Sequence, residues 1–345
     1  MIRPLLCLLA LTAPATAQEA VTTFAARTDD PAVILQLRST TDTGIFAPVL
    51  DAFVAENPSV AVRYEQWGSN ALHAATLADC TSGQGVTDAV ISSGVHQMVD
   101  LVNRACAQPY ASPLTLALPE ARRWRNEVWG ITQEAAVTIY NRAAVPDAEV
   151  PRSRFDLLDL MRRKPQTYRD RIATYDIAAS GLGDLFAFMD SQQATTFGGL
   201  LEGFARVDAV ATCCSAEIIA GVAQGRYLIA YNVLGSYLDD ATADQVGVVA
   251  PQDYTLILSR AFLIPRAAPQ AGTAARLLDF ILSPRGQAIL AANGLVQQAG
   301  LPDQDLPDSA RRPIPIAPTL LVAMDEARRR IFLETWRTAF DRGRP

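Results

Sequence analysis

The chain is poor in the residues on which most enzyme active sites depend. It has two histidines among 345 residues, His73 and His96, and Lys164 is its single lysine. No G-x-S-x-G, H-E-x-x-H or P-loop pattern occurs, so the sequence offers no nucleophile elbow, zincin site or phosphate-binding loop. We therefore expect no enzymatic activity and no cofactor. The net charge of −6 and the lack of a basic stripe also argue against a nucleic-acid-binding surface.

Long apolar runs are absent after the first residues. One run follows Arg3 and precedes Ala15-Thr16-Ala17, which has the A-x-A form of a signal-peptidase site. This run is shorter than the ~20 apolar residues that a membrane-spanning helix needs. The pattern predicts a cleaved signal peptide at residues 1–17 and export to the periplasm. The remaining chain suffices for about two domains, and residues 18–32 are expected to form a loose polar tail.

Cysteine is also scarce, with five residues, one of them inside the expected signal peptide. The other four, Cys80, Cys106, Cys213 and Cys214, allow three pairings. An oxidising compartment favours disulfides. A bridge between Cys80 and Cys106 is reasonable because the strand and helix between them can bring the two ends together. The adjacent Cys213 and Cys214 can form a vicinal disulfide or pack as buried thiols, and we favour the thiols.

One strand–turn–helix pattern occurs twice in the chain: an apolar strand, a small polar turn and an amphipathic helix. Residues 35–54 and residues 172–189 both follow it. A helix N-terminus offers free N–H groups and the positive end of the helix dipole. Two such turns facing each other would hold a small anion from both sides. Their donors are Ser39, Thr40, Thr41, Thr43, Ser180 and Gly181, with Asp42 as a helix cap or as a partner for a sugar hydroxyl.

Strands and helices alternate in two sets, over residues 33–102 and residues 155–249. Such alternation favours parallel pairing in open α/β sheets, whose ligands bind at the carboxyl ends of the strands. Long extended segments at residues 129–140 and 254–265 flank the second set, and they predict two crossovers between two lobes. Residues 320–340 are expected to form an amphipathic helix.

Three segments carry a family resemblance: VTIYNR in the first crossover, GRYLIAYNVLGSY in the second set, and LLDFILSPRGQAILAANG in the last part. With the signal peptide and the Ser/Thr turn, they resemble type 2 periplasmic solute-binding proteins of ABC importers, in the subgroup of ferric-ion, hexose-phosphate and phosphoglycerate binders. The resemblance implies an α/β fold of two lobes, each a mixed, mostly parallel sheet flanked by helices, joined by a two-stranded hinge. It implies a first lobe of residues 30–135 and 252–345, and a second of residues 136–251.

The resemblance also implies where the ligand contacts lie. Residues 37–43 and 91–94 match the two ligand loops of the first lobe. In the second lobe, Ser180-Gly181 matches the helix cap, and Tyr231-Asn232 matches the strand-end loop. Further contacts are expected from Gln133, Tyr175 and Asp176, whereas arginine, a common phosphate clamp, is scarce near these turns. The full expected set is Ser39, Thr40, Thr41, Asp42, Thr43, Ser92, Ser93, Gln133, Tyr175, Asp176, Ser180, Gly181, Tyr231 and Asn232.

The strand-end loop of this chain differs from that of the ferric binders. For those proteins, the resemblance implies an adjacent Tyr-Tyr pair at this position. This chain reads Ala230-Tyr231-Asn232, and a single phenolate is a weak ligand set for Fe(III). The sequence therefore predicts capture of a small anionic solute, phosphorylated or carboxylated, by a monomer that closes near residues 135–138 and 250–255 and serves an ABC permease. Two alternatives stay open: presentation of a solute to a membrane histidine kinase, and ferric-ion binding.

Overall fold

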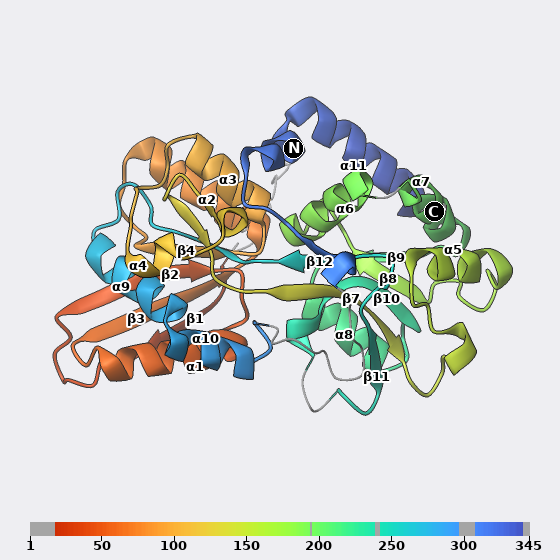
Figure 1. The fold of residues 1–345 in the computed structure, drawn as a ribbon, viewed down its shortest axis with the longest axis horizontal. Helices are drawn as coiled ribbons and strands as arrows, with labels where there is room; N and C mark the ends of the chain where they lie inside the picture. Colours follow the sequence, from red (N-terminus) through yellow and green to blue (C-terminus); the bar gives the residue numbers. More distant parts are fainter. Residues whose placement is uncertain (1–17, 194, 239–241, 297–307, 341–345) are drawn as a thin grey trace, which may run out of the picture.

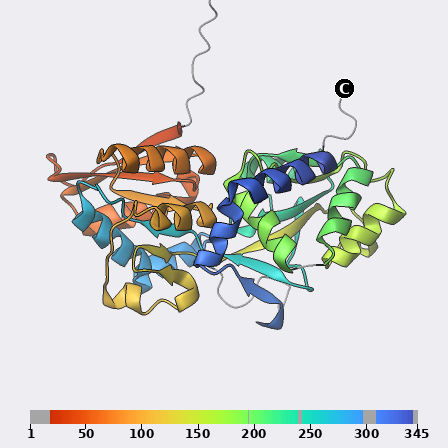
Figure 2. The same ribbon diagram turned by 90° about the horizontal axis from the view of Figure 1, so that it is seen from above.

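Two β-sheets, each flanked by helices, organise the structure. The computed structural model describes residues 18–193, 195–238, 242–296 and 308–340, so the expected signal peptide lies outside the described residues. Each sheet has seven strands within these ranges, and the sheets stand side by side in two lobes (Figures 1 and 2). The expected two-lobed α/β fold is confirmed.

The sheet of the first lobe is mixed. Its strands are β1 (Gln18–Phe24), β2 (Val33–Ser39), β3 (Val60–Trp67), β4 (Ala89–Ser92), β5 (Arg123–Trp124), β6 (Val128–Gly130) and β13 (Ala261–Leu263), in the order β1-β3-β2-β4-β13-β6-β5. Strand β2 is parallel to β3 and β4, whereas β1 and β13 pair antiparallel. The loose tail expected at residues 18–32 is wrong in its first part, because β1 pairs with β3 and buries Phe24 against Tyr64.

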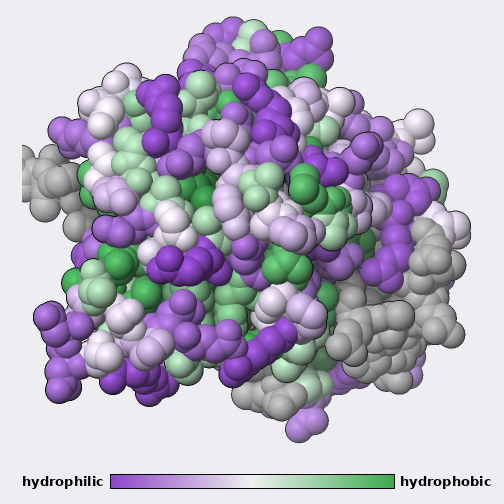
Figure 3. Space-filling view, turned by 60° about the vertical axis from the view of Figure 1, so that its left-hand side comes forward, coloured by the Kyte–Doolittle hydropathy of each residue, from purple (hydrophilic) through white to green (hydrophobic). Residues whose placement is uncertain are grey.

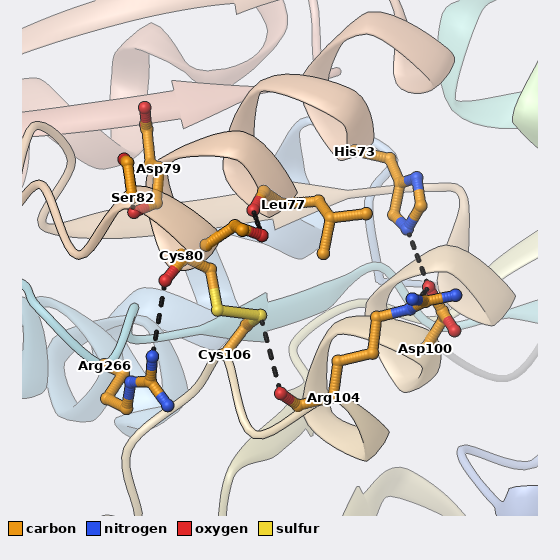
Figure 4. Close-up of a disulfide and its surroundings, with 10 residues drawn as sticks. His73, Leu77, Asp79, Cys80, Ser82, Asp100, Arg104, Cys106 and Arg266 are labelled. Carbon is orange, nitrogen blue, oxygen red and sulfur yellow. Dashed lines mark hydrogen bonds and ion pairs between the residues drawn. A yellow bond between two sulfur atoms is a disulfide. The ribbon is translucent and has the colours of Figure 1, made fainter.

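Helices cover both faces of this sheet. Helices α1 (Thr43–Glu56), α9 (Ala271–Leu282) and α10 (Pro284–Ala292) share one core with Ile91 of β4, whereas α2 (Ser69–Ser82) and α3 (Val95–Asn103) share another with Val90. Neighbouring strand residues point to opposite faces, so these two helix groups lie on opposite sides. Helix α4 (Pro113–Leu116) follows α3. The expected Cys80–Cys106 disulfide is present and ties the end of α2 to the chain after α3 (Figure 4).

The second lobe repeats the design with another mixed sheet. Its strands are β7 (Glu134–Asn141), β8 (Ile172–Tyr175), β9 (Val210–Thr212), β10 (Ile229–Leu234), β11 (Val246–Val249), β12 (Thr255–Leu258) and β14 (Arg311–Pro313). Strand β8 is parallel to β9 and β10, whereas β7 is antiparallel to β10, β11 and β12. The flanking helices are α5 (Arg154–Arg163), α6 (Gly181–Gln193), α7 (Phe197–Arg206), α8 (Ser215–Ala223) and α11 (Glu326–Phe340).

Two extended segments connect the lobes, as expected. The chain leaves β6 for β7 and returns from β12 to β13, and β7 pairs with β12. The residues that change sheets are 131–133 and 259–260. They bond to each other: the Ile131 N–H donates to the Arg260 carbonyl (2.9 Å), and the Arg260 N–H donates to Thr132 Oγ1 (2.8 Å). This two-stranded connection does not coincide with the expected hinge near residues 135–138 and 250–255, because β7 and β12 already belong to the second sheet.

The expected assignment of residues 252–345 to the first lobe is wrong for β12, β14 and α11, whereas β13, α9 and α10 belong to the first sheet and its core. Strands β12 and β14 extend the second sheet, and α11 packs on α7 through Phe340 and Phe204, whose ring centroids are 5.6 Å apart. The expected helix at residues 320–340 is broken at Asp325, where the 3₁₀ helix η5 (Pro318–Met324) ends. Helix η5 contacts α3 of the first lobe, so the segment bridges both lobes. Short 3₁₀ turns elsewhere are η1 (Glu120–Arg122), η2 (Asp147–Glu149), η3 (Gly235–Tyr237) and η4 (Asp308–Ala310).

The surface corrects one cysteine expectation. Cys213 and Cys214 form a vicinal disulfide at the start of α8, and both are exposed, so the favoured buried thiols are wrong. Both cysteines lie between β9 and α8, where their side chains are exposed to solvent.

Most residues on the face in Figure 3 are hydrophilic, and its hydrophobic patches are small and separate. No helix in the described part of the chain combines the length and the apolar character needed to cross a bilayer.

Candidate functional site

The turn between β2 and α1 is built around Thr41, which is fully buried. Its N–H donates to Ser39 Oγ (3.0 Å), and its carbonyl accepts a hydrogen bond from the Tyr64 hydroxyl (2.5 Å). Its own hydroxyl accepts from Nη1 of Arg260 (2.9 Å). Ser39 and Thr41 therefore shape the turn and connect it to the second crossover.

The ends of β2 and β4 meet at a pair of hydroxyl groups. The Ser93 N–H donates to Thr40 Oγ1 (2.9 Å), and the two hydroxyl oxygens are 3.1 Å apart. Ser92 is buried and accepts a hydrogen bond from the Gly94 N–H (3.0 Å). The two expected ligand loops of the first lobe are thus adjacent, because parallel neighbouring strands end at the same edge of a sheet.

Asp42 faces the second lobe rather than capping α1. Its side chain makes no capping hydrogen bond, so the cap expected from the sequence is wrong. The hydroxyl of Tyr237 donates to Asp42 Oδ1 at 3.4 Å across the interface between the lobes. Burial raises the pKa of Asp42, which the charge of Arg260 only partly offsets. The next residue, Thr43, donates its N–H to Gln66 Oε1 (3.0 Å).

A fully buried ion pair stands where the two crossovers meet. Arg260 binds Glu134 through Nε–Oε1 (2.8 Å) and Nη2–Oε2 (3.0 Å), and neither side chain is exposed. The hydroxyls of Thr132 and Ser236 also donate to Glu134. Burial alone would lower the pKa of Arg260, but the Glu134 carboxylate raises it above its ordinary value. The guanidinium therefore stays charged, and it lies 5.6 Å from the Tyr237 ring.

Sequence reasoning missed Ser236, Tyr237 and Arg260 as members of the site, and it considered Glu134 only as a crossover residue that would repel an anion unless it binds a hydroxyl. Two signals were available. Arg260 is the one charged residue in the mostly apolar run at residues 255–265, and a buried charge needs a partner. The Gly235-Ser236-Tyr237 turn follows directly after the strand at residues 229–234.

Tyr231 and Asn232 are not at a strand end, which corrects the sequence analysis. Both lie within β10, and both donate to Asp190 Oδ2 at 2.6 Å. Asp190 also accepts from Nη2 of Arg154 (3.0 Å), and all four side chains are buried. The Tyr231 hydroxyl and Asn232 Nδ2 serve this internal network, and the strand-end position that faces Asp42 is occupied by Tyr237.

Tyr175, Asp176 and Gln133 support turns beside the site. The Tyr175 hydroxyl is 2.6 Å from Ser215 Oγ, and burial raises the pKa of this tyrosine. Asp176 Oδ1 accepts a hydrogen bond from the Ala178 N–H (2.9 Å), which shapes the turn before α6. The half-buried Gln133 donates its N–H to the Leu295 carbonyl (2.9 Å).

The turn before α6 contacts the first lobe directly. The Gly181 N–H donates to Ser69 Oγ (2.8 Å), and Ser180, next to it, is buried. Nδ2 of Asn70 donates to the carbonyls of Ala178 (2.9 Å) and Ala179 (3.0 Å). The N-terminus of α6 thus lies against α2 of the first lobe, whereas the turn before α1 meets the second lobe at Tyr237.

Gln97 joins the two halves of this interface. A Cβ added at Gly94 would lie 2.5 Å from Gln97 Oε1, and one added at Gly181 would lie 2.8 Å from the same amide. Gly94 follows Ser93 and Gly181 starts α6, so the Gln97 amide fills the space between the strand-end loop and the helix. We call the residues from Thr40–Asp42 and Ser93 through Gln97 to Ser69 and Gly181, with Arg260 and Tyr237, the interlobe seam.

A groove of about 660 Å³ opens at one end of the interlobe seam. Its walls are α2 and α3 of the first lobe, Ala178 of the second, and α11, and they include Asn70, His73 and Gln97. Figure 4 shows His73 pointing toward Asp100 on this wall. Within the described ranges, no three His, Cys, Asp or Glu side chains come together in an arrangement that could hold a metal ion.

Comparisons with known proteins agree with this architecture. A search of the curated proteins found no match. The substrate-binding protein of an ABC transporter from Agrobacterium tumefaciens is 29% identical with a TM-score of 0.87, over 94% of this chain and 100% of that one. Iron-bound HitA from Pseudomonas aeruginosa is 15% identical (TM-score 0.68, 89% and 99% covered), and a ferric binding protein from Campylobacter jejuni is 16% identical (0.64, 89% and 98%). The latter two show the fold alone.

The family comparison is more direct. The sequence model of the bacterial extracellular solute-binding proteins matches residues 39–288, which include both crossovers and the loops of the interlobe seam. Members of this family and the Agrobacterium relative are solute-binding components of ABC transporters, not enzymes, in agreement with the sequence analysis. The chain belongs to the family of bacterial extracellular solute-binding proteins.

Proposed function

We propose that this protein captures a small anionic solute, carrying a phosphate or carboxylate group, at the interlobe seam in the periplasm. It then delivers the solute to an ABC permease. The observation that supports the proposal is that two helix N-termini lie at the interface between the lobes: the turn before α1 faces Tyr237 of the second lobe, and the start of α6 bonds to Ser69 of the first. Both helices are long enough to carry a useful dipole, and anions bind favourably at such ends.

The charges at the seam support recognition through hydrogen bonds. Glu134 neutralises the charge of Arg260, so an anion at the seam meets hydrogen-bond donors rather than an unpaired cation. Among the described residues, none accepts a hydrogen bond from the Gly44 N–H in the first turn of α1, and the space beside its Cα is open. A phosphate or carboxylate oxygen fits such a donor, because N–H groups bind anions without bringing a charge of their own.

The same residues argue against a ferric site. Fe(III) takes hard, anionic oxygen ligands. Glu134 is already bonded to Arg260, Thr132 and Ser236, which leaves Tyr237 and Asp42 as the oxygen groups that face each other. Two such groups fill only part of an iron coordination shell.

Thermal unfolding with a ligand panel tests the proposal. The panel contains glycerol phosphates, phosphoglycerates, hexose phosphates, di- and tricarboxylates, uncharged sugars and ferric citrate. An anion at a hundred times its dissociation constant should stabilise the protein by about 2.7 kcal/mol. Stabilisation by ferric citrate or by uncharged sugars, with none from phosphates or carboxylates, would contradict the proposed ligand class.

A further inference from the structure

The first turn of α2 reaches across the interlobe seam and occupies a donor of the other lobe. Ser69, the first residue of α2, accepts a hydrogen bond from the Gly181 N–H at 2.8 Å. Gly181 is the first residue of α6, and both residues are buried. The Ser69 hydroxyl of the first lobe therefore accepts from an N–H group at the positive, N-terminal end of α6 in the second lobe.

Neighbouring contacts fix Ser69 in this position. Asn70 donates to two carbonyls of the turn before α6, at 2.9 and 3.0 Å, and accepts from Gln97 Nε2 at 2.7 Å. The absence of side chains at Gly94 and Gly181 leaves room for the Gln97 amide. Ser69, Asn70 and Gln97 thus form a polar contact that joins the lobes directly.

One atom in this contact has no partner. Gln97 is 5% exposed, and its Oε1 accepts no hydrogen bond from any described group. A buried acceptor without a donor is unfavourable, and natural proteins rarely keep one without a reason. A solute at the α6 N-terminus would lie beside this oxygen and could supply the missing donor, for example a hydroxyl group next to its anionic group.

We propose that Ser69 is an affinity-determining residue that competes with the solute. Its hydroxyl oxygen stands where an anionic oxygen would accept from the Gly181 N–H, so a solute must displace it before the lobes close around the solute. The part concerning affinity rests on the proposed function. The part concerning the direct contact between the lobes does not, because it rests on the hydrogen bonds that join them.

Hydrogen–deuterium exchange of the Gly181 N–H tests the contact between the lobes. A single hydrogen bond contributes about 0.5–1.5 kcal/mol, so Ser69→Ala should speed exchange at Gly181 roughly 2- to 12-fold in solute-free protein. Ser82→Ala is the matched control, because Ser82 is exposed at the other end of α2 and bonds only within that helix. Ser69→Thr keeps a hydroxyl and should retain slow exchange. Equal exchange in all these proteins would overturn the proposal.

Calorimetric titration with inorganic phosphate and with 3-phosphoglycerate tests the competition. Losing the competitor should tighten binding of either anion by roughly 2- to 12-fold in Ser69→Ala, with no change in Ser82→Ala. Weaker binding in Ser69→Ala would overturn the proposal, because it would make Ser69 a ligand of the solute. If neither anion binds any variant, the proposed solute class fails, and the exchange result alone decides whether the contact exists. If Ser69→Ala does not fold, Ser69→Gly removes the same hydroxyl.

Discussion

Removing the carboxylate of Glu134 leaves the guanidinium of Arg260 buried and unpaired. Neither side chain is exposed, and the pair is held by two hydrogen bonds of 2.8 and 3.0 Å at the meeting point of the crossovers. Breaking one side of a buried ion pair typically costs 3–5 kcal/mol, because the remaining charge has lost both water and its partner. We therefore expect Glu134→Ala to lower the free energy of unfolding by about 3–5 kcal/mol.

Urea unfolding followed by circular dichroism measures this loss. The matched control is Asp159→Ala, which breaks an ion pair with Arg163 whose side chains are 57% and 59% exposed. Such exposed pairs contribute at most about 1 kcal/mol. A double variant, Glu134→Leu with Arg260→Met, removes both charges and should recover most of the lost stability. Equal losses in Glu134→Ala and Asp159→Ala would refute the reasoning, because they would show that the buried charge is not left unpaired.

Three further perturbations have defined outcomes. Replacing Cys80 and Cys106 with serine opens a loop of sequence separation 26, and the chain-entropy model gives a loss of about 3.5 kcal/mol in urea unfolding. Tyr231→Phe removes a buried hydroxyl that donates to Asp190 at 2.6 Å, and should lower the free energy of unfolding by about 1–3 kcal/mol. Because burial raises the pKa of Asp42 above 3.8, the native state binds its proton more tightly than the unfolded state. The stability from this proton is present below pH 3.8 and is lost as the pH rises through the folded pKa, so the advantage of Asp42→Asn over the natural protein should grow over that interval. A pH-independent difference between these two proteins would contradict this prediction.

The architecture could be predicted because its signals are local. Alternating strands and helices, the Ser/Thr turn after β2 and the glycine turn before α6 each occupy a few consecutive residues, and their physical meaning does not depend on distant parts of the chain. The extended crossovers were also recognisable from composition. Their sheet membership was not, because β7 and β12 join the second sheet through pairing with each other and with β10 and β14.

The error at Tyr231 has a specific structural cause. The register of β10 against β7 shifts between Ala230 and Val233, and Asn232 has a φ of +57°. This irregularity lets the strand continue to Leu234 after a residue that is uncommon in strands, so the strand end lies later than the polar Asn232 suggests. The tyrosine that reaches the interlobe seam is consequently Tyr237.

The role of Arg260 depends on contacts that no sequence window contains. Its partners Glu134 and Thr41 lie 126 and 219 residues away in the chain. Arginine is therefore scarce near the ligand turns along the sequence, but in the folded protein Arg260 lies beside Thr41. The C-terminal helix illustrates the same limit, since its apolar face was recognisable but its contact with α7 of the second lobe was not.

The donors at the interlobe seam share a feature that bears on how a solute is selected. Arg260 is bonded to Glu134, the Ser93 N–H to Thr40, and the Gly181 N–H to Ser69. A solute that binds there must exchange these hydrogen bonds for its own, and the net gain from each exchange is small compared with the bond itself. Discrimination then depends on whether a solute can replace all the displaced partners at once, since any donor left without one is penalised. The seam would therefore reject a solute that lacks one of the required acceptor groups, and this discrimination would not depend on a large net charge at the seam.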